Sequence, residues 1–171
     1  MKMQPANTTR LSTKHAGEPA FQAVVSAPGF SLGVLCDEQA IERIVFLPPR
    51  PAQAATGKLA AEAARQLDTY LQDAEFRCQL PLRTAGTPFQ RRVWQQIAAI
   101  PVHRTRSYGD IARELVNAPR AVGQACGANP FPVVVPCHRV LAARGGLGGF
   151  ARQDGGFLLD VKRWLLTHEG V

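Results

Sequence analysis

The stretch "NPFPVVVPCHRVL", residues 129–141, sets an apolar run between prolines and follows it directly with Cys137 and His138. The run "FPVVVP" is too short for a helix and rich in β-branched residues, so it predicts a buried strand over residues 131–136. A buried strand needs only its valines. The thiol and imidazole that stand side by side at its end therefore call for a chemical explanation.

A free thiol has a pKa of about 8.5, so only a few per cent is thiolate at neutral pH. His138 can accept the proton of Cys137, but in an extended chain the two side chains point to opposite faces, which favours a bridging water over direct contact. A carboxylate would hold the histidine tautomer and stabilise the imidazolium. Of the five acids in the second half, we expect Glu169 to reach His138, because it ends the apolar-faced helix predicted over residues 157–170. The helix dipole disfavours a carboxylate there, which argues for function rather than stability.

Two short helices are predicted upstream of this stretch. "SYGDIARELV" (107–116) begins with a capping-box-like Ser107 and Asp110, and "PRAVGQACGA" (119–128) opens on a proline. Joined by a tight turn, they suggest a helix-turn-helix. The outer side of the second helix carries Arg120 and four small or polar residues: Ala121, Gly123, Gln124 and Gly127. Each glycine costs about 1 kcal/mol in a helix, so a flat face is predicted to approach a nucleic-acid groove or, alternatively, the protein's own sheet.

The positive charge of the chain is concentrated in its second half. The net charge is +7. Residues 1–84 hold nine Lys/Arg against eight Asp/Glu, and residues 85–171 hold eleven against five, ten of the eleven being arginine. Because the arginine fork suits phosphate oxygens, nucleic acid is a candidate partner, and a merely solvated basic surface is the alternative.

The first half predicts a small sheet with a covering helix. Residues 30–36 and 40–48 alternate as a hairpin of two half-buried strands, and residues 57–74 carry an amphipathic helix. "PLRTAGTP" (81–88) interrupts both periods and reads as a linker, after which a helix marked by Phe89, Val93, Ile97 and Ile100 follows. We therefore expect an α/β (α+β) fold with a loose tail over 1–19, a sheet-plus-helix domain over 20–84 and a mainly helical domain over 85–171.

Composition sets the broad class of protein. With 171 residues and 46% apolar content the chain can bury a core. It lacks the 18 or so consecutive apolar residues of a membrane span and the apolar centre of an export signal, so a cytoplasmic location without membrane contact is expected. The four cysteines show no CxxC pair or zinc spacing, and His15 and His103 are expected at the surface, so we predict no metal and no cofactor. "RGGLGGF" (144–150) lacks the GK[ST] of a nucleotide loop and reads as a flexible wing.

"PCHRV" after "NPFPVVV", preceded by "PRAVGQACGAN" and followed by "KRWLLTHEG", closely resembles the O6-alkylguanine-DNA alkyltransferase family from about Thr87 to the C-terminus. The resemblance implies a DNA-repair protein that flips O6-alkylguanine out of double-stranded DNA and takes the alkyl group irreversibly onto its own cysteine, once per molecule. It also implies a ribonuclease-H-like first domain, a winged helix-turn-helix in the second, minor-groove binding, and a monomer that can bind DNA cooperatively. Whether O4-alkylthymine is accepted stays open.

Matched position by position, Cys137 looks like the acceptor, and His138 with Glu169 like its water-bridged relay. Asn129 matches the asparagine that braces the turn before the cysteine, and Tyr108 the residue that helps rotate the nucleotide and donates to the guanine. Arg120 looks like the finger that replaces the extruded base. Further DNA contacts are expected at Pro119, Ala121, Gly123 and Gln90. The substrate pocket is expected to use Val140, whose carbonyl would read the base, with Phe150, Pro132, Cys126 and Ala151, although the chain's long segment between Phe150 and Lys162 leaves Ala151 without a clean match.

Three other functions fit parts of the pattern. A cysteine hydrolase would also need Cys, His and an acid, but it requires an oxyanion hole that no motif identifies. A damage-recognition module without catalysis would lack the acceptor cysteine, whereas Cys137 is present. A helix-turn-helix regulator would need Asn, Gln and Arg side chains for major-groove edges, and the helix over 119–128 offers few of them.

Overall fold

The computed structural model describes residues 17, 19–150 and 156–171, so most of the predicted tail and Ala151 lie outside the described residues. The first half contains a three-stranded antiparallel sheet of β1 (Ala23–Ala27), β2 (Phe30–Cys36) and β3 (Ile41–Leu47), in the order β1-β2-β3. The predicted hairpin is β2–β3. The sequence pattern did not predict β1, because its first three residues are buried on both faces of the sheet and show no alternation.

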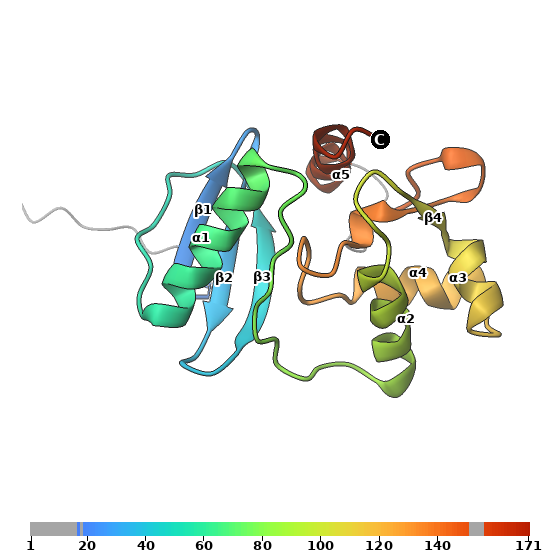
Figure 1. The fold of residues 1–171 in the computed structure, drawn as a ribbon, viewed down its shortest axis with the longest axis horizontal. Helices are drawn as coiled ribbons and strands as arrows, with labels where there is room; N and C mark the ends of the chain where they lie inside the picture. The colour runs from blue at the N-terminus through green and yellow to red at the C-terminus, as the bar shows by residue number, and fades with distance from the viewer. Residues whose placement is uncertain (1–16, 18, 151–155) are drawn as a thin grey trace, which may run out of the picture.

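Helix α1 (Lys58–Gln72) covers one face of this sheet (Figure 1). Ala63, Leu67 and Tyr70 of its apolar stripe are buried, as the amphipathic pattern predicted, and Ala60 is buried beside them. Its position brings Tyr70 to the side of the sheet that faces the second half of the chain.

The second half is mainly helical, with α2 (Pro88–Ala98), α3 (Tyr108–Glu114), α4 (Pro119–Gly127) and α5 (Phe157–His168). Thr87 and Gln90 form a full capping box on α2, and Ser107 and Asp110 form one on α3, so local sequence explains where both helices begin. Strands β4 (Arg106–Ser107) and β5 (Val140–Leu141) pair in parallel and hold the start of α3 beside the residues that follow His138. A short 3-10 turn, η2 (Ala143–Gly145), lies in the predicted wing.

The strand predicted over residues 131–136 is wrong. This segment forms turns and runs into the 3-10 helix η1 (Cys137–Arg139). Val133 has a positive φ of 72°, and the amide of Val135 donates to the carbonyl of Phe131, which is a turn and not a ladder bond. Prolines at 130, 132 and 136 remove three backbone donors, so the apolar run is buried without a sheet to join.

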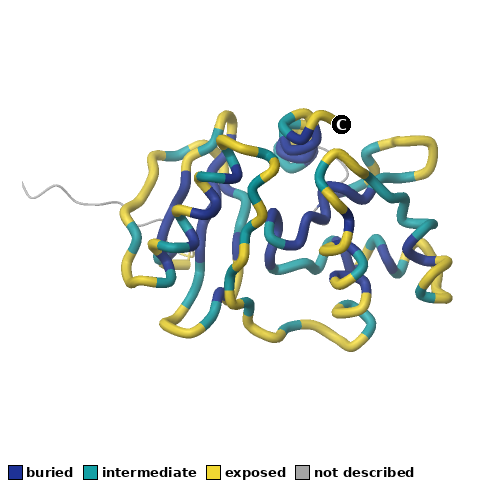
Figure 2. Tube along the Cα trace, viewed as in Figure 1, coloured by how far each residue is buried: buried dark blue, intermediate teal, exposed yellow. Residues whose placement is uncertain are grey.

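The two halves are connected by a hydrogen bond from the edge of the sheet, in which the amide of Ile44 on β3 donates to the carbonyl of Pro130 at 2.9 Å. The amide of Ile41 donates to the carbonyl of Pro81, in the segment that leads to the second half, at 2.7 Å. Helix α5 lies between the halves (Figure 1), and Figure 2 shows it buried along its inner side, like the segment before η1. The mixed helix-and-sheet class is thus confirmed, while the domain boundary near residue 84 stays a prediction. No helix in the described ranges is long and apolar enough to cross a membrane.

Candidate active site

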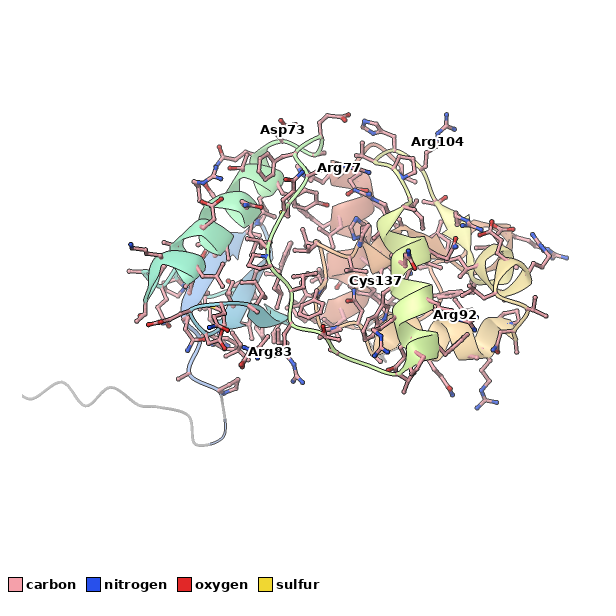
Figure 3. The ribbon with its side chains drawn as sticks, turned by 60° about the horizontal axis from the view of Figure 1, so that its bottom comes forward. Asp73, Arg77, Arg83, Arg92, Arg104 and Cys137 are labelled. Atoms are coloured by element: carbon pink, nitrogen blue, oxygen red, sulfur yellow. The ribbon has the colours of Figure 1, made fainter. Side chains whose placement is uncertain are left out.

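A cavity of about 770 Å³ brings the predicted DNA-contacting helix and the cysteine together. Cys137 is buried, and Figure 3 labels it near the middle of the molecule. Gly123, Gln124 and Gly127 of α4 line this cavity, while the approach of this face to a nucleic-acid groove stays a prediction. The lining residues are Ser107 of β4, Tyr108, Gly109 and Arg113 of α3, Pro119, Arg120, Gly123, Gln124, Cys126 and Gly127 of α4, Cys137 of η1, Ala142 and Ala143 just before the wing, and Gly149 and Phe150 of the wing.

A second cavity of about 390 Å³ lies on the other side of the same cysteine. It is formed where residues 43–46 of β3 face residues 126–130 and Pro132, and it shares Cys126, Cys137 and Phe150 with the first cavity. Cys137 therefore borders two cavities, one lined by α3 and α4 and the other lined by β3.

Behind the cysteine, Glu169 collects four hydrogen bonds. Its Oε1 accepts from His138 Nε2 at 3.0 Å, Arg139 Nη2 at 2.7 Å and the Tyr70 hydroxyl at 2.8 Å, and its Oε2 accepts from Arg139 Nε at 2.8 Å. His138 is 1% and Glu169 0% exposed, so solvent does not screen these contacts. The predicted pairing of His138 with Glu169 is present in this geometry.

Glu169 occupies the C-cap of α5, where a helix ends in a Schellman motif. Gly170 has a φ of 71°, its amide donates to Thr167, and the amide of Val171 donates to Leu166. Glycine at 170 lets the chain turn so that the carboxylate points back into the molecule. The donors around it offset the unfavourable helix dipole that the sequence indicated.

The protonation states of this pair follow from burial and hydrogen bonding. Burial alone raises the pKa of Glu169, but the hydrogen bonds from His138, Arg139 and Tyr70 outweigh it and hold that pKa well below its usual range. Burial lowers the pKa of His138, against the pull of Glu169. The carboxylate accepts a hydrogen bond from Nε2–H, so neutral His138 keeps a lone pair on Nδ1. This Nδ1 atom has no hydrogen-bond partner in the described part of the chain.

The thiol of Cys137 is not a resting thiolate. The residue is 6% exposed, and burial raises the pKa of its thiol. A hydrogen bond from Asn129 and the charge of Lys162 act in the opposite direction. Asn129 also donates to the carbonyl of Val135 at 2.8 Å and accepts from the amide of Phe131 at 2.9 Å, so it does span the turn before the cysteine. Deprotonation of Cys137 therefore requires a base at the moment of reaction.

Lys162 is a fully buried cation at the base of the wing. Its Nζ donates to the carbonyls of Val140 at 2.8 Å and Leu147 at 2.6 Å, and lies 3.5 Å from that of Gly149. Burial lowers the pKa of this ammonium to about 8, and a thiolate at Cys137 or Cys126 acts against that shift. Lys162 thus holds the wing in place through its carbonyl groups and supplies positive charge near the sulfur of Cys137.

Several predicted residues lie elsewhere than expected. Val140 is fully buried and lines neither cavity, and its carbonyl accepts from Lys162. Pro132 lines only the second cavity, and Gln90 lines neither, since its side chain caps α2.

Other predicted residues do line the first cavity. The Tyr108 hydroxyl donates to the carbonyl of Gly149 at 3.2 Å, on the cavity wall. Pro119, Arg120, Gly123, Cys126 and Phe150 all line the first cavity, and Ala121 adjoins them on α4.

Three buried polar residues of this site were not predicted: Tyr70, Arg139 and Lys162. Lys162 had a usable signal, because it stands four residues after Leu158 and three before Leu165, within the apolar stripe of its helix. Tyr70 was identified as a core position, but the partner of its hydroxyl is 99 residues away. Arg139 directly follows Cys137 and His138, and in the sequence it contributes only to the basic charge of the second half.

Comparison with known proteins agrees with this geometry. The model of the 6-O-methylguanine DNA methyltransferase DNA-binding domain matches residues 88–171. A methylated-DNA–protein-cysteine methyltransferase of Methanosarcina mazei is 34% identical over 154 residues, which cover 85% of this chain and 94% of that protein. The chain belongs to this methyltransferase family. A Salmonella typhimurium methyltransferase of the same name is 52% identical over 93 residues, and there the match spans 53% of this chain but only about half, 52%, of the relative.

The fold agrees with solved structures of the methyltransferase family. The Mycobacterium tuberculosis O6-methylguanine methyltransferase superposes with a TM-score of 0.72 at 32% identity, covering 88% of this chain and 93% of that one. The same organism's protein in complex with DNA gives a TM-score of 0.69 at 34% identity, with 85% and 90% covered.

Proposed function

We propose that this protein repairs O6-alkylguanine in double-stranded DNA by moving the alkyl group to the sulfur of Cys137. One observation carries the proposal: Cys137 shares a cavity with the flat face of α4 and Arg120, and its neighbour His138 is bonded to the buried Glu169. A cavity of about 770 Å³ is within the range that holds small ligands such as a nucleobase. One continuous stretch, residues 119–139, supplies the alkyl-accepting sulfur of Cys137, the base His138 and the DNA-facing helix α4.

The DNA contact would be made by α4 in the minor groove. Gly123, Gly127 and Ala121 keep its face low enough to approach the bases, and exposed Arg120 extends from the same face to replace the flipped nucleotide in the stack. The arginines of the second half would contact phosphates.

The chemistry balances with the groups present. Nδ1 of His138 takes the Cys137 proton through a bridging water, and the thiolate attacks the alkyl carbon as the bond from carbon to O6 breaks. The bonding pair stays on the guanine, which takes one proton from solvent water and leaves neutral, while the imidazolium of His138 returns the thiol proton to solvent. Tyr108 would supply a hydrogen bond to the leaving base after giving up Gly149. Because the thioether product is stable to water, each molecule reacts once.

The proposal is tested by mixing the protein with duplex containing a single O6-methylguanine and weighing the peptides of the protein afterwards. We expect the reaction to stop at one methyl per protein, with the added mass on the peptide that holds Cys137. Restored guanine beyond one equivalent, with no modified peptide, would indicate a turning-over cysteine hydrolase and contradict the proposal.

Replacing Arg120 with alanine should slow transfer from a paired lesion by about 10- to 100-fold, because the cost of unstacking the base, a few kcal/mol, is no longer offset. Transfer from the free base O6-methylguanine should change little, since nothing is unstacked. Arg65→Ala is the matched control, because Arg65 is an exposed arginine paired with Glu62 on α1 in the first half, and this variant should act on the paired lesion like the parent. Equal losses on duplex and free base would count against a finger role for Arg120.

A further inference from the structure

Tyr70 is the one contribution of α1 to the cluster around Glu169 within the described chain. Its side chain is 2% exposed, and its hydroxyl donates to Oε1 of Glu169, the same oxygen that accepts the Nε2 proton of His138. The family model that matches this chain begins at residue 88, so Tyr70 lies outside it.

The rest of Tyr70 fixes the end of α5 where Glu169 stands. Its carbonyl accepts from His168 Nε2 at 2.7 Å, and its ring meets the His168 ring edge-on at 5.4 Å between centroids. His168 in turn stacks on Trp164 at 4.8 Å. One residue of α1 therefore holds both the backbone turn that carries the carboxylate and the carboxylate itself.

We propose that Tyr70 is a positioning residue through which the first half of the chain sets the strength of the relay between Glu169 and His138. This inference builds on the proposed function, and it assigns a role in that reaction to the half in which the sequence showed no catalytic constellation. The hydrogen bond from the Tyr70 hydroxyl partly neutralises the negative charge on Oε1 of Glu169, so this oxygen stabilises the imidazolium form of His138 less strongly. His138 then stays neutral, with Nδ1 free to accept the thiol proton.

The effect of removing the hydroxyl has a definite sign. In Tyr70→Phe, Oε1 keeps only His138 and Arg139 as donors, so the imidazolium form of His138 is better stabilised and the pKa of His138 rises. The groups that face this pair stay the same. They are Arg139 and Cys137 of η1, Lys162 of α5, His103 at the carbonyl of Glu169, with Glu75 beyond it, and Cys78 near Tyr70.

Two measurements on the full chain test this. The rate of methyl transfer from O6-methylguanine duplex is followed from pH 5 to pH 9, and the ring of His138 is titrated by NMR without DNA. In Tyr70→Phe we expect both the acid limb of the rate profile and the titration midpoint to move upward by about 0.5 to 1 pH unit, the equivalent of one hydrogen bond. The rate on the acid limb should fall several-fold, and the rate on the plateau above that limb should be nearly unchanged.

Leu67→Ala is the matched control, because it removes a fully buried apolar side chain one turn before Tyr70 on α1 and leaves the hydroxyl on Glu169. It should lower the melting temperature without moving either midpoint. A Tyr70→Phe protein whose His138 titrates as in the parent, or whose rate falls equally at every pH, would overturn the inference. A parent protein that transfers no methyl group, with the NMR shift still present in the variant, would overturn the proposed function and leave the role of Tyr70 standing.

Discussion

Replacing Glu169 with alanine is expected to lower the free energy of unfolding by about 3 to 5 kcal/mol, a large share of the roughly 5 to 15 kcal/mol of a typical domain. The substitution removes the acceptor of four hydrogen bonds and leaves the Arg139 guanidinium buried without its counter-charge. In a chain of this size that loss corresponds to a fall of about 6 to 20 °C in melting temperature, measurable by calorimetry.

Glu114→Ala provides the matched control. Glu114 also pairs with an arginine, Arg106, at 2.6 Å, but the Glu114 side chain is 52% exposed. Exposed pairs contribute about 0 to 1 kcal/mol, so this variant should melt within a few degrees of the parent. Similar losses in the two variants would mean that burial of Glu169 does not determine its contribution.

The pH dependence of the Glu169 contribution has a clear sign. Because the folded protein holds the pKa of Glu169 below the value of 4.5 for a free glutamate, its stabilisation is fully present above about pH 5. It is lost as pH falls through the lower, folded value. The difference in stability between the parent and Glu169→Ala should therefore shrink on acidification.

The Glu169→Ala variant should also transfer methyl groups about 10²- to 10⁴-fold more slowly at neutral pH, as expected for a disabled general base.

Local signals were sufficient to predict the helices of this fold. Apolar stripes predicted α1 and α5, and the cap residues Thr87 and Ser107 marked the starts of α2 and α3. The turns before Cys137 could not be predicted in this way, because valines carry a high strand propensity and only tertiary contacts make Val133 adopt a positive φ. Strand β1 was missed for a related reason, since a strand buried on both faces loses its alternation.

In the candidate site, too, residues with a local sequence signal were predicted and residues without one were missed. Cys137, His138 and Glu169 were predicted because a thiol beside an imidazole and a carboxylate at a helix end are unusual in sequence. Their partners Tyr70 and Arg139 are ordinary residues whose role exists only after α1, η1 and α5 come together. Long-range pairing of common residue types leaves no local pattern, so a single sequence does not reveal it.

Replacing Cys137 with serine should reduce alkyl transfer by about 10⁴-fold or more, while binding of the lesion-containing duplex is retained. A serine hydroxyl fits the same space, but its far higher pKa makes its proton much harder for His138 to remove, and its oxygen is a poorer nucleophile toward an alkyl carbon than sulfur. Rapid-quench transfer assays and a binding titration on the same duplex separate the two effects.

Cys126→Ser is the control that makes this result specific to one sulfur. Cys126 lines both cavities with Cys137, is 7% exposed, and has a thiol whose pKa burial raises well above its usual range. It stands on the inner face of α4, where a serine hydroxyl can bond to the carbonyl one turn earlier, so the variant should fold and transfer within a few-fold of the parent. If Cys126→Ser were inactive and Cys137→Ser active, proximity to the cavity rather than the His138 relay would decide which thiol reacts, and the acceptor would have to be reassigned to α4.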